Sequence, residues 1–333
     1  MKPRAVLIVA LTLGLLTAPL AAEAQQRTRP VTIGVLCAGF CPFPVPAGSS
    51  RPLITALESV GLVQGRTLAW DIGGIVNAED LVAVEAQKLV SRRPDLIFVW
   101  PGSVAAARAA KDATRTIPIV LMAVPDVVEH GLADSLARPG GNVTGTSIPL
   151  YDLTVKQVQV LKEINPRIKR IIVVQGGLDR GNRQTVDRLR GAAASLGLAA
   201  GISLTDATNA EQALATAQRG VSGVLAIGSM PFVVHSRVRA LALERKLPFI
   251  IAWRAYESGG GTGGTLITYG PRFAAVAERT AYLIDRIFKG TPPGRLPVEE
   301  LTSYELVIDG VMAKALGLTI PAGVKARADV VLD

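Results

Sequence analysis

Short apolar runs alternate with stretches of helical periodicity along the first part of the chain. Compact runs typical of strands buried on both faces of a parallel sheet occur at 31–36, 67–72, 96–100 and 118–122. Between them, apolar residues recur every three or four positions, as in a helix that packs on one side. This alternation predicts right-handed βαβ connections and a doubly wound α/β sheet.

The same pattern restarts near residue 150. Further strands are expected at 171–174, 200–204, 223–227 and 249–252, with helices between them. The sequence therefore predicts two similar α/β units in tandem. The remaining pattern predicts a strand at 266–269, a helix at 273–288 and a strand at 304–308, and it does not indicate which unit these join.

The stretch Arg138–Ser147 lies between the two units. Pro139 to Asn142 favour a tight turn, and the β-branched residues Val143, Thr144 and Thr146 favour a strand. A strand that leaves one unit and enters the next would form a hinge. An ordinary loop is the alternative, and the position between two repeated patterns favours the hinge.

The N-terminus has the features of a secretory signal peptide. Lys2 and Arg4 precede an apolar run, 5–17, and Ala22-Glu23-Ala24 is a small-x-small cleavage pattern. A membrane anchor is the alternative, but an apolar run of about 13 residues is shorter than the roughly 20 that span a bilayer. The sequence predicts that residues 1–24 are a signal peptide cleaved after Ala24, and that the protein is periplasmic or secreted.

Charge and cysteine content argue against several kinds of site. The formal net charge is +9, but lysine and arginine are scattered singly and aromatic residues are sparse, so no nucleic-acid surface is expected. Cys37 and Cys41 lie in a Pro-rich loop, where they either form a small disulfide or stay unbonded. They do not predict a metal site, because His130 and His235 are distant in sequence and a zinc site needs four ligands.

No arrangement of residues predicts catalysis. The sequence lacks G-x-S-x-G, H-E-x-x-H and a G-x-G-x-x-G after the first strand. Candidate binding residues lie instead in loops at the carboxyl ends of the strands, where α/β sheets bind ligands. Gly102 and Ser103 open a helix whose N–H groups could bind an anion; the alternative is that Ser103 only caps its helix. The equivalent loops of the second unit hold Ser229 and residues 253–256.

A series of phrases spread over nearly the whole chain resembles a known family. The phrases are Val60-Gly-Leu-Val-Gln-Gly65, Ser135-Leu-Ala-Arg-Pro-Gly-Gly-Asn-Val-Thr-Gly145, Leu247-Pro-Phe, Tyr269-Gly-Pro, Tyr304-Glu-Leu-Val-Ile and Ala313-Lys-Ala-Leu-Gly-Leu-Thr-Ile-Pro321. In this order they resemble the periplasmic substrate-binding proteins of ABC transporters, in the group that includes the tryptophan-binding proteins. The loop after the second unit's first strand differs from the Asn-Pro of many relatives, so the ligand could differ too.

The resemblance implies a type I periplasmic binding protein fold, in which two Rossmann-like lobes are joined by a three-segment hinge. The first lobe would comprise 31–147 plus 269–296, and the second 148–268 plus 297–333. A small ligand would be held between the lobes when they close. The positions that match the family's contacts are the Gly102-Ser103 loop, Asp126, Ser147, Trp253, Arg254 and Tyr269.

The resemblance also implies a function. We expect a non-enzymatic monomer without a cofactor, which captures a small polar ligand such as an amino acid or another carboxylate and delivers it to an ABC permease in the inner membrane. Two alternatives use the same lobes. The protein could present its closed form to a membrane sensor, or it could be a secreted enzyme that works in the same cleft.

Overall fold

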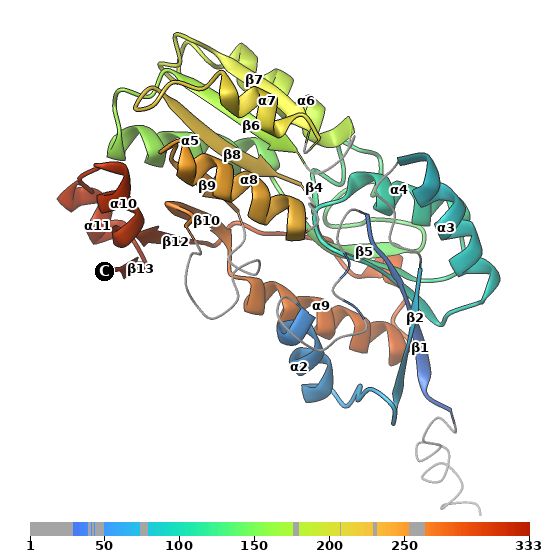
Figure 1. The fold of residues 1–333 in the computed structure, drawn as a ribbon. Coiled ribbons are helices and arrows are strands. Elements are labelled where there is room, and N and C mark those ends of the chain that lie inside the picture. The colour runs from blue at the N-terminus through green and yellow to red at the C-terminus, as the bar shows by residue number, and fades with distance from the viewer. Residues whose placement is uncertain are drawn as a thin grey trace, which may run out of the picture.

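Residues 29–38, 41, 43, 50–73, 79–175, 180–206, 208–228, 232–252 and 264–333 are described by a computed structural model. They form two β-sheets, each covered by helices, that lie at opposite ends of the molecule (Figure 1). The predicted signal peptide lies outside the described residues. Among the helices in the described part of the chain, none combines the length and apolar character that a bilayer-spanning segment needs.

The first sheet has the strand order β11-β5-β4-β3-β1-β2, and all its neighbouring strands are parallel. Its strands are β1 (Val31–Leu36), β2 (Leu68–Ile72), β3 (Leu96–Val99), β4 (Ile119–Pro125), β5 (Val143–Ile148) and β11 (Glu299–Glu300). The first five strands follow the doubly wound order 2-1-3-4-5. Their carboxyl ends therefore meet at one edge, where the loops of the first unit gather.

The second sheet repeats this topology. Its order is β13-β12-β10-β9-β8-β6-β7, with strands β6 (Arg170–Gln175), β7 (Ile202–Asp206), β8 (Ser222–Ile227), β9 (Phe249–Ile251), β10 (Ile267–Pro271), β12 (Tyr304–Asp309) and β13 (Val330–Leu332). The pairing of β10 with β12 is antiparallel, and the other pairings are parallel. The fold is α/β with two mostly parallel sheets, as the sequence predicted.

Helices cover both faces of each sheet. On the first sheet, α2 (Arg51–Ser59) and α9 (Phe273–Phe288) enclose one apolar core, and α3 (Glu79–Ser91) and α4 (Val104–Ala113) enclose the other. On the second sheet, α5 (Leu150–Ile164), α6 (Arg180–Gly191), α10 (Gly310–Leu316) and α11 (Ala322–Arg327) pack on one face. The helices α7 (Ala210–Ala215) and α8 (Phe232–Glu244) pack on the opposite face.

Within the described residues, the chain crosses between the two sheets three times. The crossings lie between β5 and α5, between β10 and α9, and between β11 and β12. Helix α9 returns to the first sheet because Val276, Ala277 and Ile284 are buried against α2 and its neighbouring strands. The second and third crossings fall a few residues later than the expected boundaries after 268 and 296. The reason is that all of β10, up to Pro271, pairs within the second sheet, and β11, at Glu299–Glu300, still pairs with β5 of the first sheet.

Two local features differ from the expected elements. Strand β7 begins at Ile202 instead of residue 200, because Gly201 has a φ of 74° and closes a turn before the strand. The short strands β11 and β13 carry no clear alternating pattern of their own. They form by pairing along the edges of completed sheets.

Candidate functional site

The end of β4 meets the first crossing at Asp126 and Ser147. The Asp126 N–H donates a 3.0 Å hydrogen bond to the carbonyl of Ile148. The Ser147 hydroxyl accepts a 3.4 Å hydrogen bond from the Val127 N–H, and the Ser147 carbonyl accepts one of 2.8 Å from the Leu301 N–H. Ser147 therefore ties the loop after β4 to the first and third crossing segments.

The Asp126 carboxyl belongs to the first lobe and faces the start of α5, the first helix of the second lobe. The main-chain N–H of Leu150, the first residue of α5, donates a hydrogen bond to it. Burial and the Glu129 carboxylate nevertheless raise the pKa of Asp126 to about 6, against the opposing effects of Arg188 and the Leu150 hydrogen bond. This carboxyl group therefore titrates closer to neutral pH than an ordinary aspartate does.

Two tyrosines of the second sheet pack against each other, and the charge of the Asp126 carboxyl group acts on one of them, Tyr304. The rings of Tyr269 on β10 and Tyr304 on β12 lie with their centroids 5.5 Å apart. Burial raises the pKa of Tyr304 to about 12, helped by Tyr269, Glu300, Asp152 and Asp126, so its hydroxyl stays protonated and can donate.

Sequence reasoning included Tyr269 but missed Tyr304 and Glu300. Tyr304 opens one of the family phrases, and this position in the sequence was the available signal. Glu300 ends a two-residue strand that no local pattern marks.

The loop after β3 has a different character. Gly102 has a φ of 86°, which suits glycine. Ser103 is buried, and its hydroxyl accepts a 3.0 Å hydrogen bond from the Ala106 N–H at the start of α4. The Ser103 hydroxyl thus caps its own helix.

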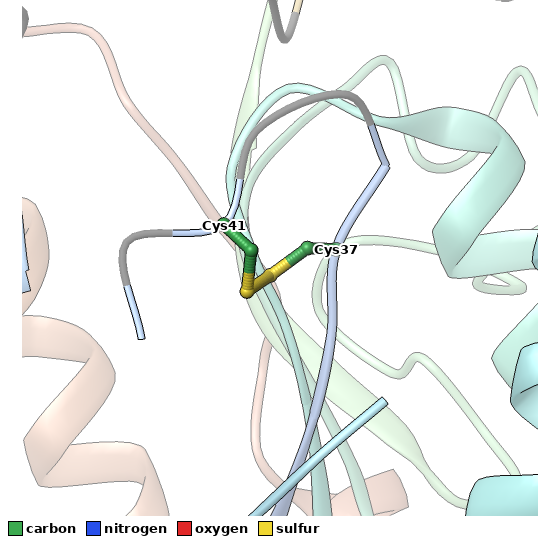
Figure 2. Close-up of a disulfide and its surroundings, with 2 residues drawn as sticks. All are labelled: Cys37 and Cys41. Atoms are coloured by element: carbon green, nitrogen blue, oxygen red, sulfur yellow. A yellow bond between two sulfur atoms is a disulfide. The ribbon is translucent and has the colours of Figure 1, made fainter. Parts of the chain in front are cut away.

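A disulfide joins Cys37 and Cys41 at the carboxyl end of β1, with the Cα atoms 5.4 Å apart (Figure 2). It stands next to an aromatic cluster of the first lobe. The Phe43 ring lies 5.4 Å from that of Trp100, which in turn lies 5.9 Å from that of Phe273. These rings belong to the apolar core that α2 and α9 enclose.

The residues predicted from the sequence are brought together only in part. The structure places Asp126, Ser147 and Tyr269 around the crossing segments, with Gly102 and Ser103 at the end of a neighbouring strand. Ser229, Trp253 and Arg254 lie outside the described residues. Within the described ranges, no group of three or more histidine, cysteine, aspartate or glutamate side chains could hold a metal ion.

Comparison with known proteins shows the family of this chain. The sequence model of the family "ABC transporter substrate binding protein" matches residues 49–332. The chain is 31% identical over 275 residues to the tyrosine-binding protein of Clostridioides difficile strain R20291, covering 81% of this chain and 76% of that protein. The chain belongs to the ABC transporter substrate-binding protein family, whose members bind substrates without catalysis and typically act outside the cytoplasm.

Solved structures of other proteins share this fold. A conserved domain protein from Vibrio cholerae superposes with a TM-score of 0.76 at 26% identity, covering 91% of this chain and 100% of that chain. The ABC domain from Streptococcus pneumonia in complex with L-Trp superposes with a TM-score of 0.73 at 21% identity and the same coverage. The fold is that of type I periplasmic binding proteins.

Proposed function

We propose that this protein is the substrate-binding component of an ABC importer, which captures an amino acid or another small carboxylate between its two lobes by hinge closure. The proposal rests chiefly on one observation. The site around the crossing segments draws residues from both units: Asp126 and Ser147 from the first, and Tyr269 and Tyr304 from the second. A ligand that touches both lobes favours the arrangement in which they are close.

The relatives and the chemistry of the site support this ligand class. The curated relative at 31% identity is a tyrosine-binding protein, which favours an amino acid here. Tyrosine hydroxyls can donate to a ligand, and an ionised Asp126 can accept from an ammonium group. We assign Asp126, Ser147 and Tyr269 to ligand contact, together with the Gly102-Ser103 loop and the predicted residues Ser229, Trp253 and Arg254.

Membership of the family supports the wider role that we propose. The protein would deliver its ligand to a permease in the inner membrane, as a monomer without a cofactor and without catalytic residues of its own. The predicted signal peptide supports a periplasmic or secreted location, with cleavage after Ala24.

A ligand screen tests this function. The purified protein is heated with each of the common amino acids, and then with small carboxylates and sugar alcohols. At about 100 times its Kd, the true ligand should raise Tm by roughly 4 °C. Calorimetry then gives the affinity of the parent, of Asp126→Asn and of Asp112→Asn, which changes an exposed carboxyl group on α4.

The expected result is stabilisation by an amino acid, with binding weakened at least tenfold in Asp126→Asn and unchanged in Asp112→Asn. If only sugar alcohols stabilise the protein, the ligand class is wrong. If no compound does so, or if the bound compound is turned over, the assignment as a receptor fails.

A further inference from the structure

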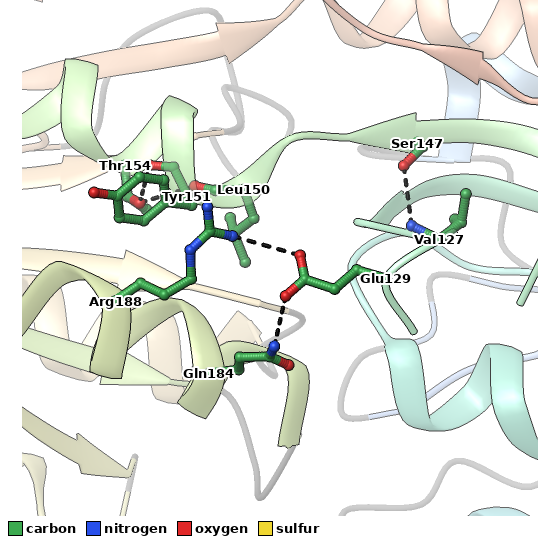
Figure 3. A network of polar contacts seen from close by, with 8 residues as sticks. All are labelled: Val127, Glu129, Ser147, Leu150, Tyr151, Thr154, Gln184 and Arg188. Atoms are coloured by element: carbon green, nitrogen blue, oxygen red, sulfur yellow. Dashed lines mark hydrogen bonds and ion pairs between the residues drawn. The ribbon is translucent and has the colours of Figure 1, made fainter. Parts of the chain in front are cut away.

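Glu129 connects the two lobes at a point outside the proposed ligand contacts. It lies in the turn that follows β4, and its carboxylate accepts a 2.5 Å hydrogen bond from the Gln184 side-chain amide on α6. The other carboxylate oxygen lies 3.4 Å from Nη1 of Arg188 on the same helix (Figure 3). Because Gln184 and Arg188 are one helical turn apart, they present both donors from one face of α6.

The turn that carries Glu129 is held at both ends by the first lobe. Asp126 at its start is bonded to Ile148 in β5, as described above. At its end, the guanidinium of Arg108 on α4 donates a 2.9 Å hydrogen bond to the carbonyl of His130. Glu129 is therefore held in place by the first lobe. A contact made by its carboxylate consequently restrains the position of the whole lobe.

On the second lobe, Arg188 is also held in place by a neighbouring side chain. The Arg188 guanidinium lies over the ring of Tyr151, 4.1 Å from its centroid, so the ring restricts where the arginine can point. Tyr151 stands in the first turn of α5, directly after the first crossing. The bridge thus joins the first lobe to the part of the second lobe that lies next to the hinge.

The position of these groups decides which state the bridge favours. Glu129 follows the carboxyl end of β4, and α6 follows the carboxyl end of β6, so the bridge joins the two edges that carry the ligand loops. Opening the lobes moves these edges apart. The bridge can exist only while they are close together.

From this geometry we infer that Glu129, Gln184 and Arg188 form an interlobe latch, which raises the population of the closed arrangement before any ligand binds. The inference concerns the regulation of the proposed binding site and rests on the proposed hinge function. The side chains of Glu129 and Arg188 are 39% and 47% exposed, so salt screens their attraction. A contact of this kind changes a two-state population by about fivefold.

Pulsed electron resonance on the ligand-free protein tests the latch. Nitroxide labels are attached at Asp112→Cys on α4 and Glu244→Cys at the end of α8, both exposed and one in each lobe. The distance distribution gives the closed fraction for the parent, Glu129→Ala and Gln184→Ala. Glu211→Ala is the matched control, because it breaks the exposed Glu211–Arg237 pair within the second lobe.

The latch predicts a closed-to-open ratio about fivefold lower in Glu129→Ala, a smaller change of the same sign in Gln184→Ala, and none in Glu211→Ala. Adding 1 M NaCl to the parent should reproduce most of the Glu129→Ala effect, because the Debye length is then about 3 Å. An unchanged or increased closed fraction in a folded Glu129→Ala variant overturns the inference. Should that variant fail to fold, Gln184→Ala and the salt titration of the parent decide it.

A second measurement separates the latch from the proposed function. Affinity for L-tyrosine is measured by calorimetry in the same variants. If L-tyrosine binds the parent, the latch predicts that its Kd rises by the factor by which the closed fraction falls. If L-tyrosine does not bind while the ligand-free populations still shift, the ligand assignment fails and the latch stands. An unchanged closed fraction in a variant that binds L-tyrosine as the parent does overturns the latch alone.

Discussion

The side-chain amide of Gln157 donates a 2.8 Å hydrogen bond to the main-chain carbonyl of Tyr269. Gln157 lies on α5, which follows the first crossing, and Tyr269 lies on β10, which precedes the second. The bond thus joins two of the segments at which the chain passes between the sheets. It also fixes the backbone that carries a proposed ligand contact.

Replacing Gln157 should therefore weaken the fold. Gln157 is 1% exposed, so Gln157→Ala leaves both a cavity and an unpaired carbonyl, and we expect a loss of about 2–4 kcal/mol in the free energy of unfolding. Urea denaturation measures this, with Gln212→Ala on the exposed side of α7 as the control, expected to change stability by less than about 0.5 kcal/mol. Equal losses in the two variants would contradict the role given to this bond.

Position 145 on β5 requires glycine because the backbone of β4 lies directly beside it. It has a φ of 143°, and a Cβ added there would overlap the main-chain carbonyl oxygen of Leu121 on β4. Gly145→Ala should cost about 3 kcal/mol or more of stability. At Gly141 the φ of 54° is also unfavourable, but an added Cβ meets no atom within 4 Å, so Gly141→Ala should cost only about 1 kcal/mol. Thermal denaturation of both proteins checks the ranking.

Asp126 should make stability depend on pH with a definite sign. Its pKa is about 6 in the folded protein and 3.8 ordinarily, so its contribution is fully present below about pH 4 and is lost as the pH rises through 6. At pH 8 we expect Asp126→Asn to be more stable than the parent by on the order of 1 kcal/mol, allowing for solvent screening. The difference should disappear toward pH 4. A constant difference across this range would show that Asp126 titrates normally.

His235 should make stability fall as the pH is lowered, which is the opposite of the dependence expected for Asp126. It is 2% exposed beside the ring of Phe249, and burial and Arg239 lower its pKa from 6.5 to about 4. Its contribution to stability is present above pH 6.5 and is lost as the pH falls toward 4.

We expect the parent to lose about 3 kcal/mol of stability from this group over that range, and His235→Leu to lack this dependence. Chemical denaturation at several pH values measures it. The experiment is made in an Asp126→Asn background, which removes the opposing slope of Asp126. An equal slope with and without His235 would assign the acid sensitivity to other groups.

Local pattern was sufficient for the repeated units. Buried strands such as Val31–Leu36 and Arg170–Gln175 are mostly apolar, and apolar residues recur every three or four positions in the helices between them. This information lies within a few neighbouring residues, so a single sequence carries it. The same is true of Ser103, whose cap on α4 involves a residue only three positions away.

The allocation of the last segments needed the tertiary structure. Helix α9 is amphipathic in either lobe, and only packing against α2 and the first sheet places it there. Strand β11 has two residues and exists because Glu299 and Glu300 pair with the completed edge of β5.

By itself, the sequence determined the α/β class, the tandem repetition and the place after β5 where the first unit ends, because each depends on periodicity along the chain. The tertiary structure alone decided that the charges of Asp126 and Glu300 act on Tyr304, and that Glu129 reaches Gln184 and Arg188. These residues are far apart in sequence, and only the crossing of the chain between two sheets brings their charges and hydroxyls within reach of one another.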